Sequence, residues 1–212
     1  MRPEPQDNLR EVAGRAFDAL AGSPVAEVAS SAGGAVHEGS ILLPFLGREL
    51  VVDPAARAVR DADGRAVSDL LAAVATRYLA LAGRLPAEGR REEVGFADVA
   101  DARGYLAPFK GRVLAPLIAR FGRDPEGFSR SAAALGGERR AEPAGASAWT
   151  VRVFPRVRMT FVIHPADDEL AADGQALFER DLFEAFTVED IVVMAQMASL
   201  ALRGRLAPAD KG

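Results

Sequence analysis

Apolar side chains recur at the spacing of an amphipathic helix in several stretches of the chain. Such stretches place their apolar residues on one face and end near glycine, so they predict helices. The predicted helices span residues 8–20, 24–32, 68–81, 112–121, 125–135 and 188–202. Ser23 and Ser68 are the expected N-caps of the second and third of these helices, and Gly33 is the expected stop of the second.

Shorter apolar runs between the helices predict strands. Residues 39–46 and 49–52 read as two strands joined by a tight turn at Gly47-Arg48. Because proline cannot donate to a ladder, Pro44 predicts a sheet edge or a bulge in the first of them.

Two more strands are expected near the end of the chain, at 148–154 and 157–163. The polar stretch 138–147, which contains proline and glycine, reads as a mobile loop before them.

The order of these elements predicts the α+β class, with short, mostly antiparallel strands packed against several helices. We expect an N-terminal helical segment at 1–35, a single α+β domain at 36–206 and a flexible tail at 207–212.

The last predicted helix has a clear start and one apolar face. Thr187 precedes it and Asp190 is its third residue, an arrangement close to a capping box. Its apolar stripe is expected to pack on the strand at 157–163, with Glu189, Gln196 and Ser199 on other faces. The stripe consists of Ile191, Met194, Ala195, Ala198 and Leu202.

Composition limits the class of protein. The chain has 212 residues, of which 49% are hydrophobic, which is enough for a substantial core. Its net charge is −4 with both signs interspersed, so neither a nucleic acid nor a membrane surface is the expected partner. No run approaches the roughly 20 apolar residues of a membrane span. The first residues lack the apolar segment of a signal peptide, and a cytoplasmic location is expected.

The chain contains no cysteine. This excludes disulfides, thiolate catalysis, and an Fe–S cluster bound by cysteines of this chain. Any metal would depend on carboxylates and on at most the two histidines.

The densest group of ionisable residues follows the strand at 157–163. Asp167, Asp168 and Glu169 form an acidic turn there, and Asp181 follows within about a dozen residues. Carboxylates at this density are what Mg²⁺ or Ca²⁺ prefers, so these four residues are the candidate metal ligands. The alternative is a solvated turn whose acids cap a helix.

Three other residues are candidates for chemistry. His164, between the strand and the acidic turn, is the candidate general acid or base; alternatively, it only bonds a backbone carbonyl. Arg48 and Arg156 are candidate cofactor or anion ligands because guanidinium groups match carboxylate and phosphate; alternatively, they lie on solvated strand faces.

An ordered set of short segments resembles one protein family. The resemblance runs from about residue 39 to 202 and is to the uncharacterised prokaryotic domain-of-unknown-function family 3786. The segments that carry it are Leu46-Gly47-Arg48-Glu49, Arg77-Tyr78-Leu79, Gly104-Tyr105, Phe109-Lys110-Gly111-Arg112, Pro116-Leu117, Phe121-Gly122, Leu135-Gly136-Gly137, Phe154-Pro155-Arg156-Val157, Asp168-Glu169, Leu177-Phe178 and Glu189-Asp190-Ile191.

This resemblance implies an origin in anaerobic bacteria or archaea. Some similar proteins carry an N-terminal cysteine cluster like that of corrinoid one-carbon proteins, which this chain lacks. This chain also differs from the family pattern at two positions. It has His164 where the pattern has tryptophan, and Glu179 where the pattern has aspartate.

Three functions remain open at the level of sequence. The first is a ligand-binding or accessory module, linked to anaerobic one-carbon or corrinoid metabolism by the resemblance alone. The second is a carboxylate-based, metal-dependent hydrolase or transferase. The third is a structural subunit that binds a protein partner. No recognisable catalytic motif is present, which favours the first.

Overall fold

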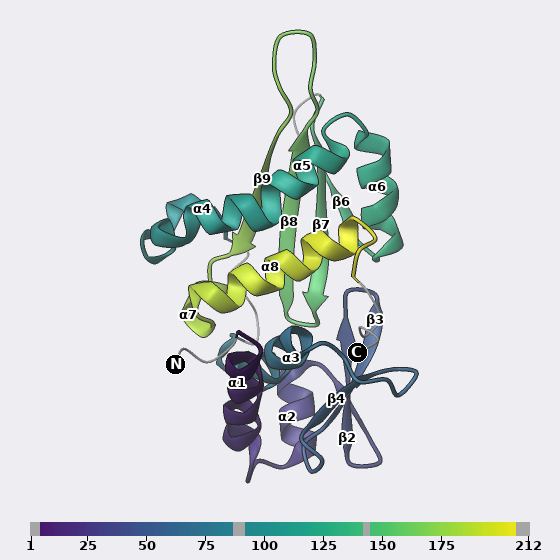
Figure 1. Cartoon of the computed structure of the whole chain (residues 1–212), viewed down its shortest axis with the longest axis vertical. Helices are drawn as coiled ribbons and strands as arrows, with labels where there is room; N and C mark the ends of the chain where they lie inside the picture. The colour runs from purple at the N-terminus through teal and green to yellow at the C-terminus, as the bar shows by residue number, and fades with distance from the viewer. Residues whose placement is uncertain (1–4, 87–91, 142–144, 207–212) are drawn as a thin grey trace.

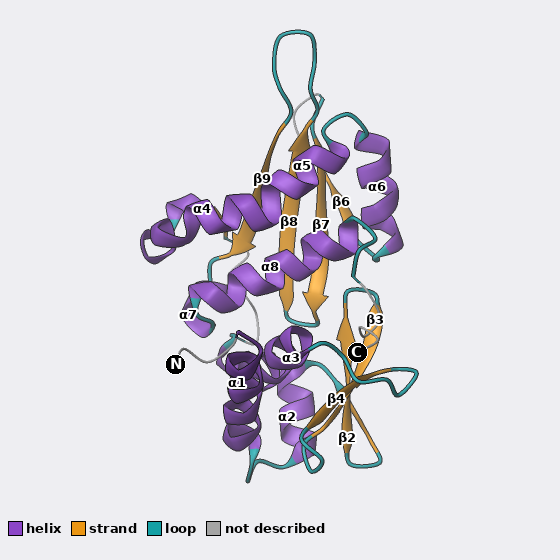
Figure 2. Cartoon of the chain, viewed as in Figure 1, coloured by secondary structure: helices purple, strands orange, loops and turns teal. Residues whose placement is uncertain are grey.

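The chain folds into two lobes that lie end to end (Figure 1). The structure is a computed structural model that describes residues 5–86, 92–141 and 145–206. The N-terminal lobe comprises residues 5–86 and the C-terminal lobe comprises residues 92–206. Each contains an antiparallel sheet with helices beside it (Figure 2), so the fold is α+β, as the sequence predicts. The predicted tail at 207–212 lies outside the described residues.

The N-terminal lobe combines three α-helices and a 3-10 turn at 82–84 with a four-stranded sheet. Its strands follow one another in the order β1-β2-β3-β4, and α1 packs along α3. The helices of the predicted segment at 1–35 therefore pack within this lobe. Its elements are α1 (Pro5–Leu20), α2 (Val25–Ala32), β1 (Ala35–His37), β2 (Ser40–Phe45), β3 (Arg48–Asp53), β4 (Ala58–Asp61) and α3 (Asp69–Leu81).

The C-terminal lobe is built on a five-stranded sheet in the order β5-β9-β8-β7-β6. A π-helical turn at 110–114 joins α4 to α5. The elements are β5 (Glu93–Gly95), α4 (Leu106–Phe109), α5 (Ala115–Phe121), α6 (Pro125–Ala134), β6 (Glu138–Arg140), β7 (Ser147–Phe154), β8 (Val157–His164), β9 (Asp173–Glu179), α7 (Leu182–Ala185) and α8 (Val188–Leu202).

Some local predictions were wrong in detail. Pro24 is the N-cap of α2, with no side-chain capping bond, so Ser23 does not cap it. The β2–β3 turn is formed by Leu46 and Gly47, both with positive φ, rather than by Gly47 and Arg48. The first residues of the predicted loop at 138–147 form β6, because their backbone pairs with β7.

The two faces of the second sheet differ in chemistry. Helices α5 and α8 run across one face (Figure 1), which carries buried Met159, Phe161 and Phe178. The opposite face carries Thr150 and Thr160, directly opposite each other, and their hydroxyls lie 2.7 Å apart. This alternation is the period-two pattern of a strand.

One ion pair crosses that polar face from edge to edge. Glu93 of β5 accepts a 2.7 Å hydrogen bond from Thr160 and pairs with Arg140 of β6 at 2.9 Å. In a flat sheet these edge strands would lie about 19 Å apart, beyond the reach of the two side chains. The sheet therefore curls around its polar face, and the edges approach each other over Thr160.

Arg156, at the β7–β8 turn, joins the two lobes. Its guanidinium donates four hydrogen bonds of 2.7 to 2.9 Å to backbone carbonyl groups of the N-terminal lobe. These carbonyl groups belong to Ser31, Ala82, Leu85 and Pro86. Ser31 lies in the last turn of α2 and Ala82 is the C-cap of α3, whereas Leu85 and Pro86 follow the 3-10 turn at 82–84. Carbonyl groups near helix ends often lack a partner within the helix.

Tyr78 and Gly33 complete the same contact. The buried Tyr78 hydroxyl donates to the Ala32 carbonyl at 2.6 Å and accepts from the Arg156 N–H at 3.2 Å. Gly33 has a φ of 70°, and a Cβ there would lie 2.7 Å from the Pro155 side chain. Glycine is therefore needed both for its conformation and for the close approach of the lobes.

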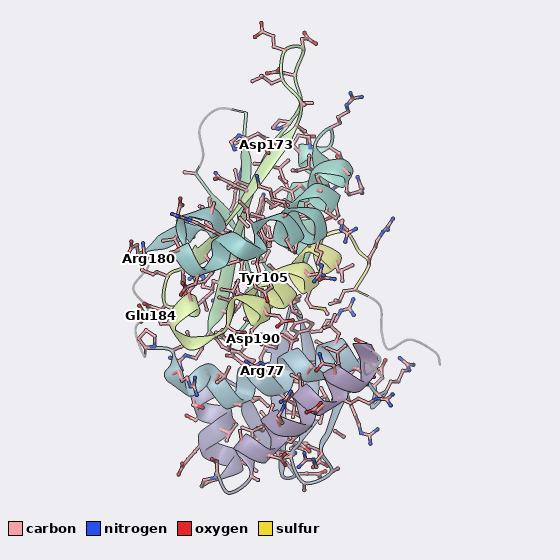
Figure 3. The ribbon with its side chains drawn as sticks, turned by 60° about the vertical axis from the view of Figure 1, so that its left-hand side comes forward. Arg77, Tyr105, Asp173, Arg180, Glu184 and Asp190 are labelled. Atoms are coloured by element: carbon pink, nitrogen blue, oxygen red, sulfur yellow. The ribbon has the colours of Figure 1, made fainter. Side chains whose placement is uncertain are left out.

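A second bond between the lobes connects α3 with α8. The Arg77 guanidinium binds the Asp190 carboxylate through two hydrogen bonds, of 2.5 and 2.6 Å, and Figure 3 shows both residues between the two helices. Asp190 also accepts from the Thr187 backbone N–H at 3.1 Å, which completes the predicted capping box. The hydrogen bond to Asp190 raises the pKa of Arg77.

The apolar stripe predicted for α8 is confirmed, because all five of its residues are buried. Two details differ. Ser199 is also buried and donates to the Val113 carbonyl at 3.0 Å. Within the sheet, the backbone of α8 approaches β7 most closely, rather than the predicted β8.

Among the helices of the described residues, none is long and apolar enough to cross a bilayer.

Replacing Ile191 with aspartate tests the docking of α8. Ile191 is fully buried. The substitution should lower the free energy of unfolding by several kcal/mol, on the order of 3–5, because it buries an unpaired charge. Urea denaturation measures this, with the exposed Glu189→Gln as the control. An unchanged midpoint for Ile191→Asp would show that α8 is not docked as described.

Tyr78 should make stability fall with pH in the alkaline range. Burial raises the pKa of Tyr78 to about 12, against about 10 in an unfolded chain. Between these pH values the unfolded chain releases the phenol proton while the folded chain retains it. The stabilising contribution is complete below pH 10 and decreases by up to about 1.4 kcal/mol per pH unit above it.

Urea denaturation from about pH 9 to about pH 11.5 tests this expectation. Tyr78→Phe should flatten the decrease, and should also cost about 1–3 kcal/mol at neutral pH because Ala32 and Arg156 each lose a partner. The matched control is Tyr105→Phe, because Tyr105 is 42% exposed. An equal slope in wild type and Tyr78→Phe would contradict the prediction.

Arg156→Lys should destabilise the protein although it keeps the charge. A lysine has one nitrogen and cannot reach four carbonyl groups, so we expect a loss of about 2–4 kcal/mol. The control is Arg139→Lys on the exposed β6 strand. Thermal and urea denaturation of both variants measure the difference; equal stabilities would show that the guanidinium does not hold the lobes together.

Candidate functional site

The predicted acidic turn lies in the loop between β8 and β9, which projects beyond the C-terminal lobe (Figure 1). The Asp167 carboxylate accepts from the backbone N–H groups of Leu170 at 2.7 Å and Glu169 at 2.9 Å. These bonds hold the pKa of Asp167 below its usual value. Asp168 and Glu169 are exposed. The carboxylate of Asp167 therefore organises its own loop.

Asp181 lies at the other end of β9. The seven residues of that strand span about 20 Å, and Figure 3 shows Asp173 and Arg180 at its two ends. Asp181 is buried at the start of α7. The structure thus separates Asp181 from the acidic turn. Within the described ranges, no three histidine, aspartate or glutamate side chains are grouped to bind one metal ion.

His164 is the last residue of β8 and is exposed. Its cross-strand neighbour is Asp173, the first residue of β9. The histidine therefore stands at the base of the acidic loop and distant from Asp181, so the structure does not assemble it with all four candidate ligands.

The two candidate arginines have different surroundings. All four hydrogen bonds of the Arg156 guanidinium go to backbone carbonyl groups, which supports the alternative that this residue is structural. Arg48 is exposed at the start of β3. It lies opposite Phe45 and on the same face as the buried Leu50, so its side chain is placed over the core side of the sheet.

Arg48 borders a pocket of about 450 Å³ where the two lobes meet. The pocket lies between the β2–β3 hairpin, the start of α3 and the end of α8. Its floor and walls are mainly apolar: Phe45, Leu50, Val67, Leu70, Leu71, Met197, Leu200 and Leu206. This volume lies within the range of small-molecule sites, which form preferentially between packed units.

The pocket rim carries both signs of charge. Arg48 and Arg205 contribute guanidinium groups that form no ion pair within the described part of the chain. The rim acids Asp61 and Asp63 already have partners: Asp61 accepts from backbone N–H groups of its turn, and Asp63 pairs with Arg65 at 2.6 Å. Glu49 is the remaining rim carboxylate.

Two arginines follow the end of α8. Burial and, after it, the charge of Arg205 lower the pKa of Arg203. Arg205 lines the pocket.

Some residues of this pocket could not be predicted as site residues from the sequence. Arg48 was a candidate from its type and its position in a turn, whereas Met197 reads as an ordinary core residue. Arg205 and Leu206 follow the last helix and show no periodic pattern. They line the same pocket as Arg48 only because the chain after α8 turns back toward the N-terminal lobe (Figure 1).

The fold and the pocket define a two-lobed α+β protein with a ligand-sized pocket at the lobe junction. Residues 24–201 match a family model, and the chain belongs to the family described as Domain of unknown function (DUF3786). The resemblance predicted from the sequence is thereby confirmed. Comparison with curated proteins and with solved structures gave no match.

Proposed function

We propose that this protein is a ligand-binding module whose site is the pocket at the lobe junction. The observation that carries the proposal is an apolar pocket of about 450 Å³ with two arginines on its rim that have no ion-pair partner in the described structure. An apolar cavity with a few convergent polar groups is the usual form of a small-molecule site.

The pocket favours a ligand with an apolar body and an anionic end. Burying the body would remove the side chains of Leu70 and Leu200 from water, worth about 25 cal/mol per Å² of apolar area. A carboxylate would fit the guanidinium of Arg48 or Arg205, which presents paired N–H donors. Glu49 offers an acceptor to a ligand hydroxyl or amine. We therefore expect the apolar walls to select ligands by shape, and the rim arginines to select ligands with a negative charge at one end.

The resemblance adds an expectation about the pathway. Folates have an aromatic body that ends in carboxylates, so they belong to the ligand class that the pocket favours. A role in one-carbon or corrinoid metabolism, in the cytoplasm of a prokaryote, remains part of the proposal.

The geometry supports the other two functions less well. The candidate metal ligands are divided between the two ends of β9. A partner-binding subunit needs a contiguous apolar patch, whereas Val36, Tyr105 and Leu170, the large apolar residues exposed in the described structure, lie on separate elements.

A thermal-shift screen tests the proposal. The panel should contain folates, cobalamins, haem, nucleotides and medium-chain fatty acids. A ligand at about 100 times its dissociation constant adds about 2.7 kcal/mol of stability. Leu200→Trp should abolish the shift by filling the pocket, and Arg48→Ala should weaken binding about tenfold through loss of a charge-assisted bond.

Arg139→Ala is the matched control, because Arg139 is an exposed arginine remote from the pocket lining. It should leave binding unchanged. The proposal fails if no ligand of the panel binds saturably, or if binding persists in Leu200→Trp.

A further inference from the structure

A second pocket, of about 300 Å³, lies on the other side of Arg48. It is enclosed by the β2–β3 hairpin, the end of α6 and the polar face of the second sheet. Arg48, Arg152 and Arg158 all line it, together with Glu138. Three guanidinium groups and one carboxylate leave an excess of two positive charges.

The two sheet arginines form an unfavourable pair. Arg152 of β7 and Arg158 of β8 are directly opposite each other on the same face. Like charges at directly opposed positions destabilise a sheet. Such a pair needs a negative group close by.

Glu138 satisfies this need only in part. Its carboxylate lies 2.8 Å from the Arg158 guanidinium but 4.0 Å from that of Arg152. The Glu138 side chain is also 61% exposed, so water screens its charge. Arg48 then enters the same pocket from the N-terminal lobe without an ion-pair partner in the described structure. Donors for an additional anion are therefore present on two lobes.

Several other polar groups at or beside the pocket already have partners. The Thr150 hydroxyl is bonded to Thr160. Carbonyl groups at the end of α6 accept from the N–H groups of Leu135, Gly136 and Gly137.

We propose that this pocket binds a small phosphate-class dianion, such as inorganic phosphate or the phosphate group of a monoester. Arginine forks match the oxygens of phosphate bidentately, and a charge of about −2 equals the excess of positive charge. Gly136 lines the pocket, and a Cβ there would meet no atom within 4 Å, which leaves room for the remainder of a monoester. Bound phosphate would reduce the repulsion between Arg152 and Arg158.

This proposal does not depend on the apolar pocket. Arg152 and Arg158 line the small pocket but not the large one, whereas Leu200 lines the large pocket alone. Variants of these residues separate the two sites.

Calorimetric titration and thermal shift with sodium phosphate, at constant ionic strength maintained by chloride, test the inference. Wild type should bind one phosphate saturably. Arg152→Gln should weaken binding about tenfold or more, because a charge-assisted donor is lost. Without phosphate, Arg152→Gln should be at least as stable as wild type, because the like-charge pair is removed. Leu200→Trp and the control Arg139→Gln should bind phosphate as wild type does.

Each contrary result would overturn the inference. Phosphate binding that is absent in wild type, or equal in wild type and Arg152→Gln, contradicts it. A marked loss of stability in phosphate-free Arg152→Gln would show that the arginine is structural. Loss of phosphate binding in Leu200→Trp would contradict two separate sites. If no organic ligand binds but phosphate does, only the proposal for the apolar pocket is contradicted. If phosphate does not bind but an organic ligand does, only the phosphate inference is contradicted.

Discussion

The arrangement of the two lobes depends on the bonding of Arg156. One guanidinium donates to four carbonyl groups, at the end of α2 and along the segment that follows α3, and the backbone N–H of the same residue donates to Tyr78. Buried or half-buried helix ends need such partners, since an unsatisfied carbonyl group costs about 1–3 kcal/mol. The second sheet supplies these donors through the β7–β8 turn, so one residue of the C-terminal lobe is bonded to several backbone positions of the N-terminal lobe. The Arg77–Asp190 bond adds a second polar connection between the lobes, because it joins α3 to α8.

This junction also explains where the pockets lie. The lobes share one apolar core, in which the Phe154 ring lies 4.3 Å from that of Tyr78 and 5.0 Å from that of Phe45. Polar contacts lie beside this core, among them the hydrogen bond from the Leu46 N–H to the Val153 carbonyl at 3.1 Å. Two pockets remain, one mainly apolar and one lined by arginines, and Arg48 borders both. A ligand in either pocket would touch both lobes, so binding and lobe packing should be coupled.

The curled sheet places the strands that carry the arginine pocket. Thr150, Thr160, Glu93 and Arg140 form a continuous chain of hydrogen bonds across the polar face. This chain holds β5 and β6 near each other, and β6 is the strand that carries Glu138. The backbone positions of Arg152 and Arg158 are set by the pairing of β7 with β8. Sites built on strands hold their groups more precisely than sites on loops, which favours selective binding.

The sequence by itself determined the longer helices, the β2–β3 and β7–β8 hairpins, the capping box at Thr187 and the buried stripe of α8, because each depends on local periodicity or local hydrogen bonding. It did not predict β9. It also singled out Arg48 and Arg156 by residue type, but not their surroundings. Only the tertiary structure decided that Arg156 is bonded to helix ends far away in the chain, that Asp181 is separated from Asp167 by the length of β9, and that Glu138 belongs to a strand. Strand pairing and lobe packing bring distant residues together through contacts that leave no periodic signal in the chain, and this is the physical reason why both pockets were absent from the sequence-based reading.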